Sequence, residues 1–95
     1  MTRAVTVIKH STMDVSLEKA AILTAIDALT QFDVEQDAAR YIKETFDREH
    51  GPQWHCVVGK QFGCFVSHFR SDFTYFYVNA VAVLLYRTGM EADHQ

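Results

Sequence analysis

The stretch "WHCVVGKQFGCFVSHF", residues 54–69, decides the fold because here the sequence pattern changes from helical to alternating. Its segments "WHCVVG" and "FGCFVSH" are short and β-prone, and "KQ" separates them. Such runs are typical of β-strands. The stretch also holds two cysteines and two histidines within fourteen positions, which raises the question of a metal or catalytic site.

Further strands are predicted on both sides of this pair. "DFTYFYV" at 72–78 and "VAVLLYR" at 81–87 follow it, with "NA" between them, and "AVTVIK" at 4–9 lies near the N-terminus. No proline interrupts these runs, and proline is rarely found inside a sheet. Four successive strands joined by short connections favour an antiparallel sheet.

A helix is predicted over residues 17–32, where apolar side chains recur every three or four positions and form one face. Asp14 and Ser16 offer N-cap oxygens before it. The positions that define the face are Leu17, Ala21, Ala25, Ala28 and Phe32.

A second helix is predicted to begin at Asp33, because Asp33 followed three positions later by Gln36 resembles a capping box. It is predicted to end at Gly51, since glycine tolerates a left-handed C-cap and Pro52 cannot extend a helix. The element order is therefore β-α-α-β-β-β-β. This order predicts a single α+β domain over residues 1–95, with two helices packed on an antiparallel sheet and a solvated tail at 90–95.

The composition excludes several classes of protein. Hydrophobic residues make up 48% of the 95 residues, which excludes disorder as the main state. The formal net charge is −3 and no Lys/Arg cluster occurs, so nucleic acid is not expected as a partner. The longest apolar run is strand length and no signal peptide is recognised, so we expect an intracellular protein that neither enters nor binds a membrane. A chain this short buries only a small core, so a second subunit would add stability.

The cysteines and histidines of the opening stretch do not form a metal-site pattern. Cys56 and Cys64 are eight positions apart, whereas structural zinc ligands usually come in closely spaced pairs. His55 and Cys56 are adjacent on a strand and point to opposite faces. We therefore expect no metal and no cofactor. A small thiol enzyme or redox protein using Cys56 or Cys64 remains an alternative, although buried cysteines usually act as small hydrophobic residues.

Two strand patterns indicate an interaction surface. Alternation at 72–78 places Phe73, Tyr75 and Tyr77 on one face of the strand and apolar residues on the other. The helices of a two-layer domain cover only one sheet face, so the aromatic face would meet another molecule. The strand at 62–68, if it lay at a sheet edge, would suit β-augmentation, in which an extended segment is added as a further strand.

Residues 38–63, "AARYIKETFDREHGPQWHCVVGKQFG", and 73–89, "FTYFYVNAVAVLLYRTG", resemble the eight-kilodalton dynein light chain family. The resemblance extends from about residue 4 to residue 89. It implies a non-catalytic homodimer in which the strand at 62–67 crosses into the sheet of the partner. It further implies two grooves that bind short extended segments, with Thr-Gln-Thr-like motifs, of dynein intermediate chain or other client proteins and so favour client dimerisation.

The resemblance also implies roles for individual residues. The groove would be formed by Phe62, Gly63, Cys64, Phe65, Val66, Ser67 and His68 from one protomer and by Lys9, His10, Glu35, Gln36, Phe73, Tyr75 and Tyr77 from the other. The dimer interface would include His55, Phe62, Val66 and Thr88. His55 would face its symmetry mate, so its protonation would oppose association at acidic pH. Thr88 stands where the family carries a phosphorylatable serine.

Three departures from the family pattern, at Gln36, Cys64 and Ser67, predict an altered peptide preference. The usual residues there are lysine, serine and threonine. A structural subunit that has lost peptide binding is a further alternative. The resemblance places the protein in the cytoplasm with microtubule motors, or in the axoneme of a cilium or flagellum.

Overall fold

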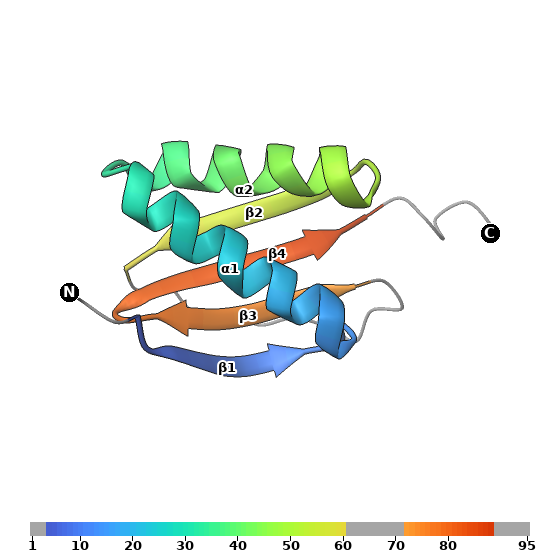
Figure 1. Cartoon of the computed structure of the whole chain (residues 1–95), viewed down its shortest axis with the longest axis horizontal. Helices are drawn as coiled ribbons and strands as arrows, with labels where there is room; N and C mark the ends of the chain where they lie inside the picture. Colours follow the sequence, from blue (N-terminus) through green and yellow to red (C-terminus); the bar gives the residue numbers. More distant parts are fainter. Residues whose placement is uncertain (1–3, 61–71, 89–95) are drawn as a thin grey trace.

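The computed structural model describes residues 4–60 and 72–88. Two helices lie on one face of a four-stranded antiparallel sheet (Figure 1). The elements are β1 (Thr6–Ser11), α1 (Val15–Gln31), α2 (Glu35–His50), β2 (Trp54–Gly59), β3 (Phe73–Val78) and β4 (Val81–Arg87). The predicted α+β class is confirmed. The strand predicted at 62–68 lies outside the described residues.

The order of strands across the sheet is β1-β3-β4-β2, so β1 and β2 are its two edges among the described strands. β3 and β4 form the central hairpin, in which Val78 pairs with Val81. Asn79 occupies this turn with φ of 55°, a left-handed conformation that asparagine tolerates. Its backbone N–H donates to the Val5 carbonyl at 2.7 Å, and its Oδ1 accepts from the Val5 N–H at 3.0 Å. These two hydrogen bonds attach Val5, the residue before β1, to the hairpin turn.

α1 begins where the sequence offers a cap. The side chain of Asp14 accepts a hydrogen bond from the Leu17 N–H at 2.8 Å, which satisfies one of the free donors of the first turn. The helix buries a row of small side chains, so its backbone can approach the sheet closely. These residues are Ala21, Ala25 and Ala28.

The predicted start of α2 is wrong. The N-cap is Val34, not Asp33, and it makes no side-chain capping bond. The Val34 carbonyl accepts from the backbone N–H groups of Asp37 and Ala38, at 3.0 and 3.1 Å, so the helix begins one residue later than the capping box requires. The predicted end is confirmed, since α2 stops at His50 and Gly51 follows it; the φ of 90° and ψ of 167° at Gly51 lie outside the left-handed helical region, in a conformation that glycine tolerates.

The core lies between the helices and the inner face of the sheet. Its largest members are Trp54, Phe46, Phe76, Ile42, Leu85 and Val83, all fully buried. Phe46 of α2 meets Trp54 of β2 edge to face, with ring centroids 4.9 Å apart. Arg87 of β4 lies over the Trp54 ring and donates from Nη2 to the His50 carbonyl at 2.6 Å. These contacts join the end of α2 to β2 and β4.

Candidate functional site

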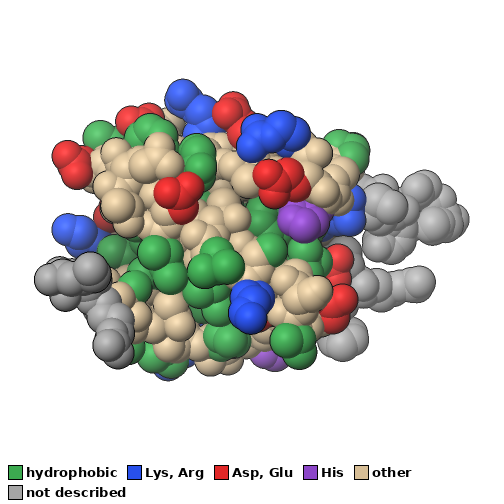
Figure 2. All heavy atoms as spheres, viewed as in Figure 1, with side chains coloured by type: hydrophobic (Ala, Val, Ile, Leu, Met, Phe, Trp, Pro, Cys, Tyr) green, Lys and Arg blue, Asp and Glu red, His purple; other side chains and the backbone are tan. Residues whose placement is uncertain are grey.

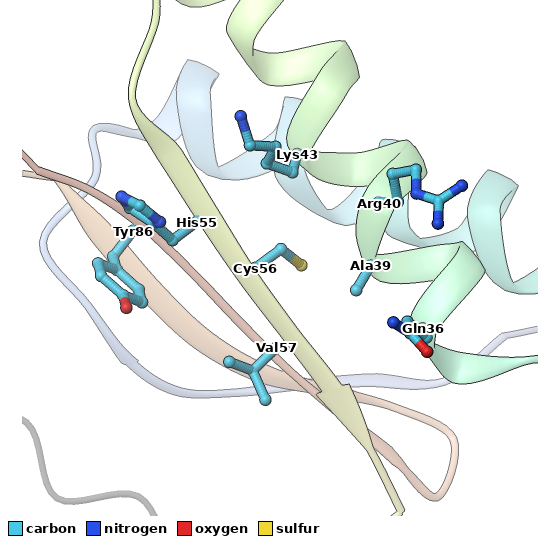
Figure 3. Close-up of a pocket in the computed structure, with 8 residues that line it drawn as sticks. All are labelled: Gln36, Ala39, Arg40, Lys43, His55, Cys56, Val57 and Tyr86. Carbon is cyan, nitrogen blue, oxygen red and sulfur yellow. The ribbon is translucent and has the colours of Figure 1, made fainter.

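The free edge of β2 adjoins a cavity of about 440 Å³ between this strand and α2 (Figure 3). No described strand pairs with this edge. The sulfur of Cys56 points toward α2, whereas His55 and Tyr86 lie together on the other side of the strand. The lining residues are Gln36, Ala39, Arg40, Lys43, His55, Cys56, Val57 and Tyr86. Side chains therefore surround the strand edge on both sides.

The two edges of the sheet differ in how well they could accept another strand. β1 has a register shift between Ile8 and His10 and carries the exposed Lys9, both of which discourage further pairing. β2 pairs with β4 in unbroken register from Trp54 to Gly59. The β2 edge is the more regular template for an added strand.

The surface over α1 differs in character from the surface over α2. Figure 2 shows charged side chains of both signs over α2 and hydrophobic ones gathered over α1. Beside α1, at the β1 edge, lies a largely apolar hollow of about 510 Å³ that includes Ile8, Val15 and Leu23. The β2-edge cavity has a more polar lining, because side chains from α2 reach it.

His55 and Thr88, both assigned to a dimer interface by resemblance, lie side by side in the structure. His55 Nε2 is 2.9 Å from Thr88 Oγ1, a hydrogen-bond distance. The imidazole also stacks on Tyr86, with ring centroids 5.2 Å apart and an interplanar angle of 26°. His55 and Thr88 are both exposed in the single chain. The imidazole is thus held at the surface, next to the free edge of β2.

Cys56 lacks the environment of a catalytic thiol. Burial raises its pKa to about 12, so the thiol is protonated at neutral pH and is a poor nucleophile. Cys64 lies outside the described residues. No group of three or more His, Cys, Asp or Glu side chains that could hold a metal occurs within residues 4–60 and 72–88.

The aromatic residues predicted on one face of β3 lie on the sheet face opposite the helices. Thr74, Phe76 and Val78 are the buried, helix-facing residues of this strand. On the other face Phe73 meets His10 edge to face at 5.1 Å, Tyr75 and Tyr77 have ring centroids 6.0 Å apart, and Lys9 Nζ is 6.0 Å from the Tyr77 ring. Lys9, His10 and the three aromatic residues therefore form one cluster.

The structure separates this cluster from the other predicted groove residues of the same protomer. Gln36 lines the cavity at the β2 edge, on the helix side of the sheet. Glu35 lines a smaller neighbouring hollow of about 270 Å³ that includes Asp33 and Lys60. The remaining predicted groove residues, 62–68, lie outside the described residues.

Arg40 and Lys43 line the cavity, and neither is among the site residues predicted from the sequence. They follow Gln36 at intervals of four and seven residues, a spacing that places all three on one side of a helix. This spacing is the signal that could have identified them. Lys43 donates to Asp47 Oδ2, and this bond and the Trp54 N–H lower the pKa of Asp47.

Residues 5–88 match the family model described as dynein light chain type 1. A solved structure of the dynein light chain-like domain of the Fasciola hepatica calcium binding protein FhCaBP2 is similar, with a TM-score of 0.79, 22% identity, and coverage of 90% of this chain and 93% of that one. The DLC-like domain of CsTAL3 is similar with a TM-score of 0.77 and 13% identity over 90% of this chain and 94% of that one. At these identities the two structures support the fold alone.

None of the described helices has the length and hydropathy that crossing a membrane would require.

Proposed function

Because the chain belongs to the dynein light chain type 1 family, we propose that it forms a homodimer that binds extended segments of client proteins, among them dynein intermediate chain. This family is non-catalytic, so the prediction that the protein is not an enzyme is confirmed. The family also implies dynein-associated partners. In the proposed dimer, the strand at 62–67 of one protomer adds to the β2 edge of the other, and clients with Thr-Gln-Thr-like motifs add beside it.

One observation carries the proposal: a regular strand edge, with which none of the described strands pairs, lies next to a cavity that α2 flanks. An exposed edge of this kind either pairs with another chain or is a liability for the folded protein. Val57, in the middle of β2, is 44% exposed in the single chain. Association through β2 would bury it.

Dimerisation also supports the client-binding step. A dimer with two equivalent grooves holds two client chains together, so the second contact forms at high effective concentration. The segments that fill the grooves would be short and extended, since strand addition uses backbone hydrogen bonds for affinity and side-chain pockets for specificity. Motor-associated localisation in the cytoplasm or an axoneme follows from such partners.

Sedimentation equilibrium of the full chain tests the dimer. We expect a dimer for the unmodified protein, a monomer for Val57→Lys, and a dimer for the control Leu23→Lys, which also places a charge at an exposed apolar position but beside the other edge. Calorimetric titration with a Thr-Gln-Thr-type peptide should then give two sites per dimer. A monomeric unmodified protein, or a Val57→Lys variant that remains dimeric, would contradict the use of the β2 edge.

A further inference from the structure

The hollow of about 510 Å³ between α1 and the β1 edge, here called the α1–β1 hollow, exposes large apolar side chains. Val15 is 84% exposed, Leu23 60% and Ile8 49%. Figure 2 shows hydrophobic side chains gathered over α1. An apolar patch of this kind is typical of a surface that contacts another molecule. β1 and β2 are opposite edges of the described sheet, so this surface is separate from the edge proposed to form the homodimer.

The lining of the α1–β1 hollow includes two charged residues, and only one of them is exposed. Glu18 is 8% exposed, and the hydroxyls of Ser11 and Thr74 donate to its two oxygens. Lys19 is exposed, and among the residues that the structure describes no carboxylate lies within ion-pair distance of it. The hollow therefore combines apolar surface with one positive charge that no described carboxylate pairs with.

Val15, Lys19 and Leu23 follow one another at four-residue intervals, so they form one ridge along α1. The ridge is about 12 Å long, or roughly two helical turns. Ridges at this spacing pack into the grooves between the ridges of a second helix. A helix with apolar residues on either side of a carboxylate, at the same intervals, would match the ridge in both shape and charge.

Charge and strand register disfavour two other occupants of the α1–β1 hollow. A twofold contact between two copies of the hollow would place both Lys19 side chains in one interface, and the lining supplies no exposed carboxylate to pair with them. An extended segment would have to pair with β1, whose register shifts between Ile8 and His10. A helix from a different protein satisfies both conditions.

We propose that the α1–β1 hollow docks an amphipathic helix of a partner protein, and that this helix carries an acidic residue within its apolar face. The docked helix would cover Val15 and Leu23 and pair its carboxylate with Lys19. The inference does not depend on the proposed homodimer, because the hollow lies at the opposite edge of the sheet.

Fluorescence anisotropy with two labelled synthetic peptides tests this docking on the full chain. Both peptides are alanine-rich helices of about 18 residues, with leucines at three- and four-residue intervals along one face. The central position of that face is glutamate in one peptide and glutamine in the other. We expect saturable binding, with the glutamate peptide bound about two- to fivefold more tightly at low ionic strength.

Variants at exposed positions identify the surface responsible and should retain the fold. Lys19→Gln should remove the preference for glutamate, and Lys19→Glu should reverse it. Leu23→Lys should weaken the binding of both peptides about tenfold, since it removes a buried leucine from the contact. The control Val57→Lys, at the β2 edge, should bind both peptides as the unmodified protein does, whatever its oligomeric state.

Three results would overturn the inference. The first is the absence of saturable binding of either peptide. The second is binding that Leu23→Lys leaves unchanged, or a preference for glutamate that persists in Lys19→Gln. The third is self-association beyond a dimer, measured by sedimentation equilibrium, that Leu23→Lys abolishes, because the hollow would then bind a second copy of the chain.

Discussion

Replacing Thr74 with valine should destabilise the protein, because Thr74 supplies a hydroxyl to a carboxylate inside the fold. Thr74 is fully buried, and its Oγ1 donates to Glu18 Oε2 at 2.9 Å. Glu18 is only 8% exposed, and its other oxygen accepts from the Ser11 hydroxyl. Ser11 Oγ in turn accepts from the Met13 N–H at 3.1 Å. The network joins the first turn of α1 to β1 and β3.

The expected magnitude follows from the chemistry of this contact. A hydrogen bond to a charged group contributes about 1.5–3 kcal/mol, and a buried carboxylate left without its donor keeps its desolvation cost. The methyl group that valine adds contributes about 0.8 kcal/mol in the opposite direction. We expect Thr74→Val to lower the free energy of unfolding by about 1–2 kcal/mol.

Urea denaturation at pH 7 and one fixed protein concentration measures this loss, since the proposed dimer would make stability depend on concentration. A double-mutant cycle with Glu18→Met removes the carboxylate as well. In that background Thr74→Val should cost little, because both polar partners are then gone. An equal cost of Thr74→Val in the two backgrounds would refute the assignment, because the hydroxyl and the carboxylate would then be uncoupled.

Three further predictions concern single residues. Arg87→Met should lower stability by about 1–2 kcal/mol in urea, since it removes the donor to the carbonyl of the last residue of α2, and an unchanged midpoint would contradict this. Asp47 has its pKa lowered mainly by the bond from Lys43, so its ionised form stabilises the fold above the ordinary value of 3.8. That stability is lost as pH falls through the lowered pKa. The Asp47→Asn variant should therefore lose less stability than the unmodified protein between neutral pH and about pH 2. Parallel curves of unfolding free energy against pH for the two proteins would argue against it. In a Cys64→Ser background, half-buried Cys56, with a pKa of about 12, should react with a thiol reagent at pH 8 much more slowly in the native protein than after unfolding, and equal rates would contradict this.

Local sequence patterns predicted most of the fold. The hairpin of β3 and β4 was predictable because its strands are short apolar runs and Asn79 suits the turn between them. β2 was predicted to the residue, from Trp54 to Gly59. The small-residue face of α1 followed from its spacing. In each case residues close in sequence determine the structure.

Element boundaries were less predictable because contacts distant in sequence decide them. β1 was predicted at 4–9 but extends from Thr6 to Ser11, where Ser11 pairs with Thr74. The next residue continues the contact through a bond from the Thr12 N–H to the Phe73 carbonyl at 2.9 Å. Nothing within 4–11 specifies that pairing. The same limit applies to α2, whose capping signal at Asp33 is not used.

The candidate site depends on sheet order, and this explains why the sequence could not identify all of its residues. The spacing of Gln36, Arg40 and Lys43 shows that they share one side of a helix. It does not show whether that side meets water or the edge of a strand. β4, which follows β2 by more than twenty residues, pairs with one side of β2, and none of the described strands pairs with the other side. Arg40 therefore lies beside the more regular of the two sheet edges among the described strands.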